Sequence, residues 1–382
     1  MDSSHPATLP QFSIPEVSII VPARNEEANL ADCLRSLTAQ TGVAFEIIVV
    51  DDASTDRTRE IARSFAGVRV ISAEPLALGG TGKMWTGKNN ALVAGAKHAH
   101  AHWLLFTDAD TVHLPGSLAR AWEEAKNERA DLLSYSPEQV VVTFAERAVM
   151  PVIFAELAAE YPPHRVREEV REEVRWQDSG VIAANGQYIL VRRAAYDAVG
   201  GHAAVATEIL EDVALARLFR DAGYRVYFRY GRDAVRTRMY RNWAQLREGW
   251  TKNLAQLFPR AEFRAFQSLL WWVAAWSMLG VAVYGAGIRH FLWIVFAAVW
   301  LLLYRRIRAA HFATANNLIA VAAGLPMYAY LLLRSKKAHA HGQVSWKGRT
   351  YSIGAPCRSA PPDPQAVKPI PRIENQGLRA KS

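Results

Sequence analysis

Two carboxylates lie close together directly after a short apolar run. Asp108 and Asp110 follow Trp103–Phe106, and this run predicts a buried β-strand. In an open α/β sheet, ligands bind in the crevice beyond the carboxyl ends of the strands. Two carboxylates placed there would suit a divalent cation, Mg²⁺ or Mn²⁺, that holds a diphosphate. Asp is also common in solvated turns, so the pair alone does not decide between a metal site and a turn.

The elements that must position these carboxylates alternate between strands and helices. Apolar runs predict strands at Val17–Val21, Phe45–Val50, Val68–Ser72 and Trp103–Phe106, and helix-length segments separate them. This alternation predicts an α/β fold with a mainly parallel sheet and helices on both faces. Parallel strands end at one edge of a sheet, so the polar residues after them should meet there. They are Arg24, Asn25, Glu26, Asp51, Asp52, Gly87, Lys88, Asp108 and Asp110.

Several motifs occur in the order and spacing of a known pattern. They are Val17–Glu27, Val49–Asp56 and Asp108–Asp110, together with Gly87–Leu92 and the pair Glu211-Asp212. In this combination they resemble the family two glycosyltransferases, over roughly residues 17–253. The resemblance implies a GT-A fold, which is a Rossmann-like nucleotide-sugar domain with a mainly parallel mixed sheet.

The resemblance also implies a task for each motif residue. Asp110, with Asp108 beside it, would hold a cation that stabilises the departing diphosphate. Asp52 would accept a hydrogen bond from a uracil-like base, with Asp51 as the alternative, which favours a UDP-linked donor. Asp212 would be the base for the acceptor hydroxyl, and direct displacement would invert the anomeric centre. The remaining donor-side residues are Pro22 and Glu26 at the nucleoside and Lys88 and Asp108 at the nucleotide.

Asp212 has a simpler explanation when it is taken alone. A carboxylate at the start of the helix predicted over Val213–Arg220 is favoured by the helix dipole, without any chemistry. The other motifs in the chain favour the base.

Residues 245–252 are a looser version of the Gln-x-x-Arg-Trp motif found in membrane members of the family. The candidates for the acceptor and diphosphate side are Gln245, Arg247, Trp250 and Lys252. Arg247 or Lys252 would meet the phosphate, and Trp250 would stack on the acceptor or anchor the chain at a membrane surface. An amphipathic interfacial helix explains the same pattern. The altered motif weighs against a processive polysaccharide synthase, which stays an alternative.

The chain changes character after Gln267. Ser268–Ile288 carries no charge and is long enough to cross a bilayer, and Phe291–Tyr304 and Ala309–Leu333 are further apolar stretches. The basic residues beside them favour the cytoplasmic side of a membrane. They are Arg305, Arg306, Arg308, Arg334, Lys336 and Lys337. Two spans and a broken third segment would keep both clusters on that side. With this apolar part, the chain resembles the branch that glycosylates hopanoids, carotenoids and ceramides.

These observations predict an integral protein of the inner membrane whose catalytic domain is cytoplasmic. The expected partners are a nucleotide sugar, a lipid acceptor and the membrane. Five parts are expected along the chain: a disordered N-terminus at 1–15, the GT-A domain at 16–240, interfacial helices at 241–266, two to three membrane helices at 267–334, and a basic, Pro-rich cytoplasmic tail at 335–382.

Other functions fit the sequence less well. The net charge of +9 gathers beside the apolar segments, so nucleic-acid binding is not expected. Residues 82–89 nearly spell a P-loop, but Asn89 stands where Ser or Thr would hold Mg²⁺. A catalytically inactive membrane scaffold of the same fold is a further alternative. Cys33 and Cys357 form no motif, and no signal peptide is predicted at the N-terminus, so no disulfide framework is expected.

Overall fold

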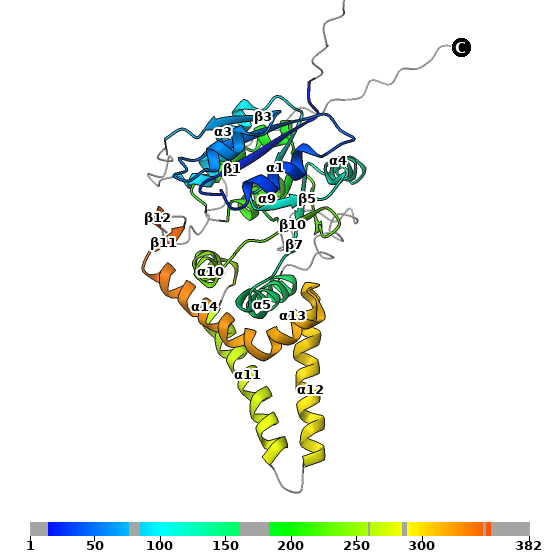
Figure 1. The fold of residues 1–382 in the computed structure, drawn as a ribbon, viewed down its shortest axis with the longest axis vertical. Helices are drawn as coiled ribbons and strands as arrows, with labels where there is room; N and C mark the ends of the chain where they lie inside the picture. The colour runs from blue at the N-terminus through cyan, green and yellow to red at the C-terminus, as the bar shows by residue number, and fades with distance from the viewer. Residues whose placement is uncertain are drawn as a thin grey trace, which may run out of the picture.

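The computed structural model describes residues 14–75, 85–160, 183–208, 210–258, 260–284, 289–346 and 349–352. These residues form an α/β domain and a helical part that extends away from it and narrows toward its end (Figure 1). The site described below lies where the two parts meet.

The described part of the α/β domain contains a seven-stranded sheet in the order β3-β2-β1-β4-β8-β6-β9. β3, β2, β1 and β4 are parallel neighbours, β8 is antiparallel to β4 and β6, and β9 is parallel to β6. The predicted α/β class with a mainly parallel mixed sheet is confirmed. The strands are β1 (Val17–Ala23), β2 (Phe45–Asp51), β3 (Val68–Ser72), β4 (Trp103–Phe106), β6 (Leu132–Ser136), β8 (Ile189–Arg192) and β9 (Val226–Tyr230).

Helices cover both faces of this sheet, which explains why most side chains of its central strands are apolar and buried. Successive side chains of a strand point to opposite faces, and Ile19 and Ile20 are both fully buried, in separate core clusters. On the Ile19 face pack α1 (Leu30–Thr38), α2 (Thr58–Arg63) and α4 (Ser117–Asn127). On the Ile20 face pack α3 (Gly87–His98), α7 (Arg193–Ala198) and α9 (Glu211–Asp221), with α8 (Gly201–Ala204) against α3.

A small second sheet lies beside the ends of β4 and β6. β10 (Val235–Thr237) pairs antiparallel with β5 (Thr111–His113) and parallel with β7 (Glu138–Gln139). Because β5 begins directly after Asp110, this sheet holds the segment that follows the two carboxylates. Thr237 on β10 donates its hydroxyl to the carbonyl oxygen of Asp110 at 3.2 Å.

A layer of helices separates the α/β domain from a long helical hairpin (Figure 1). The layer comprises α5 (Phe144–Glu160), α10 (Trp243–Leu257), the short helix η1 (Arg308–Ala310), α13 (Thr314–Ile319), the π-helical turn η2 (Ala320–Gly324) and α14 (Leu325–Ala340). The hairpin comprises α11 (Ala261–Tyr284) and α12 (Arg289–Ile307). After α14, β11 (Gln343–Trp346) pairs antiparallel with β12 (Arg349–Ser352).

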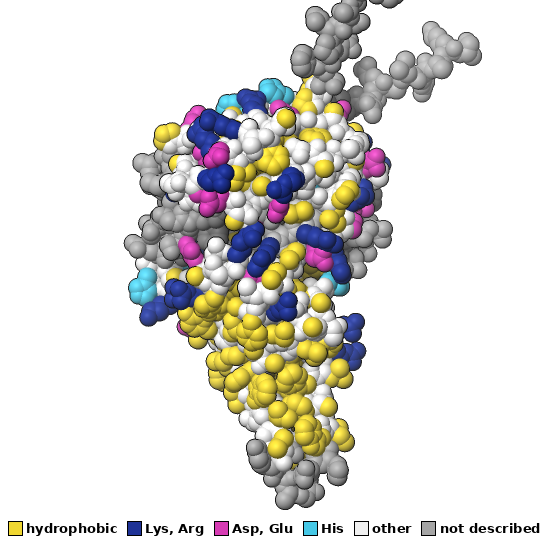
Figure 2. Space-filling model, viewed as in Figure 1, with side chains coloured by type: hydrophobic (Ala, Val, Ile, Leu, Met, Phe, Trp, Pro, Cys, Tyr) yellow, Lys and Arg dark blue, Asp and Glu magenta, His cyan; other side chains and the backbone are white. Residues whose placement is uncertain are grey.

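The surface of the hairpin is largely apolar, whereas charged side chains gather over the α/β domain and the helix layer (Figure 2). Large side chains on the hairpin are exposed along its length, including Leu270, Trp271, Trp276, Ile294 and Leu302. A contiguous apolar surface of this kind marks a site of interaction with a membrane or another apolar partner.

Among the described residues, the stretch Thr314–Ala340 is the helix that is long and apolar enough to cross a membrane, by length and composition. Half of its most apolar window is buried inside the protein. It is the third of the predicted apolar segments, and it packs against α10 and α11. The first two predicted segments form the exposed hairpin. The number of membrane helices therefore stays a prediction.

The ends of the chain differ in part from the expected layout. α14 continues to Ala340, and β11 and β12 follow within the stretch that was expected to be a tail. Most of the N-terminal stretch 1–15 and the Pro-rich stretch 353–382 lie outside the described residues.

Candidate functional site

A cavity of about 520 Å³ opens at the carboxyl ends of the parallel strands. Its volume is within the range of small-molecule sites. Its wall brings together predicted residues from distant parts of the chain, namely Pro22, Glu26, Asp52, Lys88, Asp108, Asp110, Asp212, Gln245, Trp250 and Lys252. Parallel strands deliver their following loops to one edge, and this is why residues so far apart in the sequence share a wall.

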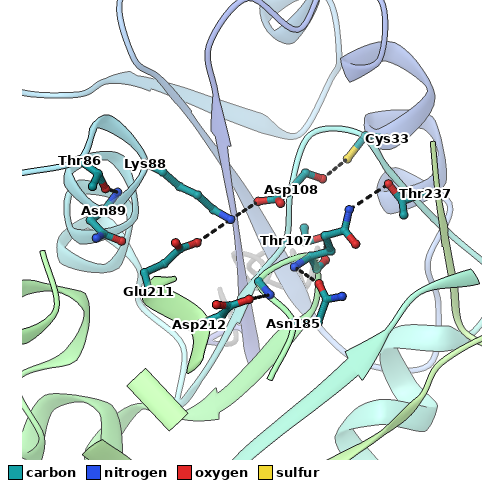
Figure 3. A network of polar contacts seen from close by, with 12 residues as sticks. Cys33, Thr86, Lys88, Asn89, Thr107, Asp108, Asn185, Glu211, Asp212 and Thr237 are labelled. Carbon is teal, nitrogen blue, oxygen red and sulfur yellow. Dashed lines mark hydrogen bonds and ion pairs between the residues drawn. The ribbon is translucent and has the colours of Figure 1, made fainter. Parts of the chain in front are cut away.

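Lys88 links two carboxylates inside this cavity (Figure 3). Its Nζ lies 2.8 Å from Asp108 Oδ1 and 2.8 Å from Glu211 Oε1. Burial would lower the pKa of Lys88, but the two carboxylates raise it well above its ordinary value. Lys88 reaches them from the first turn of α3, whose N-cap residue Thr86 accepts a hydrogen bond from the Asn89 N–H.

Asp212 lies in the first turn of α9 and is held by backbone donors. Its Oδ2 accepts the Gly186 N–H at 2.8 Å, and its Oδ1 accepts its neighbour's N–H, that of Val213, at 2.8 Å. Burial and the charge of Glu211 raise the pKa of Asp212 to about 6, while Lys88 and the two backbone donors oppose this rise. A carboxylate with this pKa is partly protonated near neutral pH and can accept or give a proton there.

The adjacent carboxyl of Glu211 behaves in the opposite way. Burial would raise its pKa, but the positive charges of Lys88 and Lys252 outweigh burial and lower it. The two neighbouring carboxyls are thus driven apart in pKa, which is typical of sites where one group carries charge and the other transfers a proton. Burial lowers the pKa of Lys252, although Glu211 opposes this effect.

Asp108 and Asp110 supply the oxygen atoms expected for a hard divalent cation. Among the residues described, no group of three or more His, Cys, Asp and Glu side chains could enclose a metal ion. Magnesium is commonly bound by one or two carboxylates and completed by substrate phosphates and water, so the two carboxylates fit such an ion. The Cys33 thiol lies 3.8 Å from the carbonyl oxygen of Asp108. Burial raises the pKa of this thiol, and the charges of Asp110, Glu26 and Asp108 add to the rise.

Asp52, rather than Asp51, lines the cavity. Asp51 is turned into the domain, where its Oδ1 accepts the Ser54 N–H at 3.3 Å and its Oδ2 lies 3.6 Å from Arg59. The Arg24 guanidinium donates to the Asp52 carbonyl oxygen at 2.6 Å and so joins the loops after β1 and β2. Glu26 accepts the Asn29 side-chain amide at 2.9 Å.

The predicted acceptor-side residues have different surroundings. Lys252 lines the cavity, whereas Arg247 is not among its lining residues. The side-chain oxygen of Gln245 accepts the Arg241 N–H at 2.8 Å, and Asn242 caps α10 by accepting the Gln245 N–H, so Gln245 is part of the hydrogen bonding at the start of this helix. Trp250 is only 2% exposed, and its indole N–H points at Met150 Sδ.

The environment of Asn89 does not suit the P-loop alternative. Its side chain is fully buried and donates to the carbonyl oxygens of Val205, Ala206 and Glu208. Its amide therefore ties α3 to the loop after α8. Residues 82–84 of that motif lie outside the described residues.

Two members of the site could not be identified individually from the sequence. Glu211 is part of a recognisable pair, but its contact with Lys88 depends on how α3 and α9 pack. Gly186 donates to Asp212 from a position where a Cβ would lie 3.0 Å from Lys88 Nζ and 3.2 Å from Glu211 Oε1. Its lack of a side chain lets the three charged groups approach.

Comparison with known proteins gives matches at the level of sequence. The model of the family described as glycosyl transferase family 2 matches residues 18–200. The 4,4'-diaponeurosporenoate glycosyltransferase of Staphylococcus aureus strain MRSA252 is 28% identical over 362 residues, which cover 90% of each chain. The protein of the same name from strain USA300 is 27% identical over the same length and coverage.

Solved structures show weaker similarity. The mannosyltransferase PcManGT from Pyrobaculum calidifontis, in complex with GDP-Man and Mn²⁺, has a TM-score of 0.46 at 18% identity and covers 86% of this chain and 88% of its own. Residues 1–349 of S. aureus TarS, in complex with UDP-GlcNAc, have a TM-score of 0.41 at 17% identity and cover 89% of this chain and 99% of their own.

Proposed function

We propose that this chain, which belongs to glycosyl transferase family 2, transfers a hexose from a nucleotide sugar to an apolar lipid. The observation that carries the proposal is the shared cavity. It collects the donor-side residues Asp52, Lys88 and Asp110, the candidate base Asp212, and apolar side chains of the helix layer. Relatives that are 27% and 28% identical to this chain are named 4,4'-diaponeurosporenoate glycosyltransferases, so a carotenoid-type lipid is the acceptor class we propose first.

On the donor side, Asp52, Pro22 and Glu26 would hold the nucleoside. Asp52 lines the cavity at the end of β2, where its carboxylate can accept the N–H of a uracil base, and we therefore propose a UDP-linked donor. Lys88 would contact the diphosphate from the first turn of α3. Its ammonium group already lies in this part of the cavity, where it pairs with Asp108.

The diphosphate requires positive charge in addition to Lys88. Asp110, with Asp108, would hold Mg²⁺ or Mn²⁺ through carboxylate oxygens. A bound divalent cation would offset the negative charge that grows on the diphosphate as the glycosidic bond breaks. Lys252 lines the same cavity and would add to that stabilisation.

Where the acceptor group is a hydroxyl, Asp212 would take its proton as the oxygen attacks the anomeric carbon; a carboxylate acceptor is already ionised and needs no base. The bond from the sugar to the diphosphate breaks on the opposite side, so the transfer would invert the anomeric centre. Two backbone donors fix the direction of the Asp212 carboxylate, and its pKa of about 6 leaves it largely ionised at neutral pH. Both properties suit a general base.

The reaction would take place at the cytoplasmic face of the inner membrane. The exposed apolar hairpin of α11 and α12 would lie in the bilayer, and the helix layer would lie at its surface (Figure 2). Basic side chains near this layer, such as Arg308 and Lys337, are exposed and would face anionic lipid headgroups.

The test uses the full chain purified in detergent. The protein is incubated with Mn²⁺, a panel of labelled nucleotide sugars, and lipid extracts that include carotenoid acids and alcohols. We expect a labelled lipid from one donor and none with Asp212→Asn. If no lipid product forms and no donor is consumed anywhere in the panel, the proposal is wrong.

A further inference from the structure

One part of the cavity wall is formed by α5 of the helix layer, and this part carries no charge. Its lining residues are Phe154, Leu157 and Ala158. Two further apolar residues line the cavity nearby: Leu257, the last residue of α10, and Met239, which precedes α10. The wall opposite, at the sheet edge, carries Asp108, Asp110 and Asp212. The cavity is therefore lined by charged side chains on one side and by apolar side chains on the other.

The two faces of α5 differ in what covers them. Phe154, Leu157 and Ala158 are spaced so that they share one face of the helix, and all three are partly exposed. On the other side, Val149, Val152 and Ile153 are at most 1% exposed and pack in the core of the helical part. Phe154 and Leu157 also pack partly against this core, and the part of their surface that remains uncovered lines the cavity.

This open face is held rigidly. A Cβ on Gly324 would lie 2.0 Å from the Ala148 carbonyl oxygen, so η2 and the first half of α5 are in backbone contact. Farther along α5, Glu156 lies 3.1 Å from Arg264 of α11 and 2.6 Å from Arg306 of α12. The wall is thus fixed to the base of the hairpin and cannot easily move to bury its own apolar surface.

We propose that the face formed by Phe154, Leu157 and Ala158 binds the apolar chain of the acceptor next to its reactive group. The inference rests on the proposed function and specifies which residues receive the acceptor. Filling the cavity with an apolar chain removes this face from water, which is favourable, and places the acceptor oxygen toward Asp212. Phe154 also meets the buried Trp250 edge to face, with ring centroids 6.2 Å apart, and this contact supports the Phe154 ring on the face.

The chemistry of this face favours a lipid over a growing polysaccharide. A sugar chain needs hydrogen-bond partners along its length, and none of the three side chains on this face has a donor or an acceptor. The face also belongs to the layer that adjoins the apolar hairpin, so it lies close to the proposed membrane (Figure 1).

The experiment labels the full chain in detergent with a long-chain alcohol that carries a diazirine, followed by peptide mass spectrometry. In the wild type we expect label on residues 154–158 of α5, and competition by the lipid extract that supports transfer. Leu157→Glu should lose this label and keep label on the hairpin. Phe144→Glu is the matched control, because Phe144 is 64% exposed at the start of the same helix and does not line the cavity.

The outcomes separate this inference from the proposed function. The proposed acceptor site is wrong if α5 is labelled as strongly in Leu157→Glu as in the wild type. It is also wrong if the label in the wild type falls only on the hairpin, even when transfer is observed. Leu157→Gln, which adds no charge, repeats the test should the glutamate variant melt at a lower temperature. Loss of donor turnover in the wild type would instead overturn the proposed function, whatever the labelling pattern.

Discussion

Lys88 and Glu211 meet at 2.8 Å between Nζ and Oε1, and their contact joins the first turns of α3 and α9. The same ammonium group lies 2.8 Å from Asp108. One lysine therefore compensates two carboxylates beside Asp212, and lowers the pKa of Asp212 as well. The charge balance of the site depends on a residue from the donor side.

Lys88→Met should shift the pH dependence of transfer as well as weaken nucleotide binding. Without the ammonium group, the pKa of Asp212 should rise, so the acidic limb of kcat/KM should move to higher pH. Lys97→Met is the control, since Lys97 is exposed on the same helix. An unchanged acidic limb would show that Lys88 does not act on the base.

Asp212→Asn should reduce transfer by about 10²- to 10⁴-fold, the usual contribution of a general base. The amide oxygen can still accept the Gly186 N–H, so the fold and the affinity for the nucleotide should be retained. Steady-state rates and calorimetric binding of the nucleotide measure the two effects. Asp221→Asn, at the exposed end of the same helix, should leave both unchanged.

The wild-type enzyme should lose activity as the pH falls through about 6. The base must be deprotonated, and its raised pKa places the loss near pH 6 instead of the ordinary range of Asp. Below this pH, kcat/KM should fall about tenfold per pH unit. The buried His113 and His202 have pKa values lowered to about 3 by burial, so they do not titrate in this window. Activity that stays constant down to pH 4 would contradict the assignment of Asp212.

Asp110→Ala should weaken the binding of the nucleotide in the presence of Mn²⁺ and leave binding in EDTA nearly unchanged. The reason is that the carboxylate would help to hold a cation whose charge offsets that of the diphosphate. Titration calorimetry with UDP, with and without Mn²⁺, measures the difference. Asp32→Ala, an exposed residue paired with Arg35, is the control. Equal losses with and without Mn²⁺ would show that Asp110 is not a metal ligand.

Glu156→Gln should destabilise the base of the hairpin. Its carboxylate is 8% exposed and pairs with Arg264 and Arg306, so its loss removes an ionic partner from both, although Arg264 keeps its contact with Glu160. Because Arg306 is 45% exposed and Arg264 keeps Glu160, the cost should lie below the roughly 3 kcal/mol of breaking a fully buried pair. Glu262→Gln removes an exposed partner of Lys336 and should cost far less. Thermal melting in detergent compares the two variants, and equal melting temperatures would be evidence against this anchor.

The order of strands and helices in the first half of the chain could be read from local patterns. Runs such as Phe45–Val50 are mostly apolar, which predicts a strand that is buried on both faces. The motif residues follow these runs directly. Strand period and chain connectivity are local properties, so they predicted the parallel core and the edge on which Asp52, Lys88 and Asp108 lie. The antiparallel pairing of β8 with β4 and β6 could not be read in this way, because these partners are distant in sequence.

The residues of α10 show the limit of that approach. Arg247 and Trp250 belong to the same motif, yet Arg247 is not part of the cavity wall and Trp250 is buried against Met150. Which face of a helix meets a cavity depends on the elements packed around it, and here α14, β11 and α5 pack against α10 and decide its rotation. No spacing within residues 245–252 contains that information.

The sequence by itself determined the α/β class, the position of the carboxylates after β1, β2 and β4, and the apolar character of the chain after Gln267. These features depend on periodicity and composition, which are local. Only the tertiary structure decided that Lys88 bridges Asp108 and Glu211, that Gly186 donates to Asp212, and that α5 turns one apolar face into the same cavity. Contacts between segments far apart in the chain form through packing, where side-chain volume and charge select one arrangement among many that the local patterns allow.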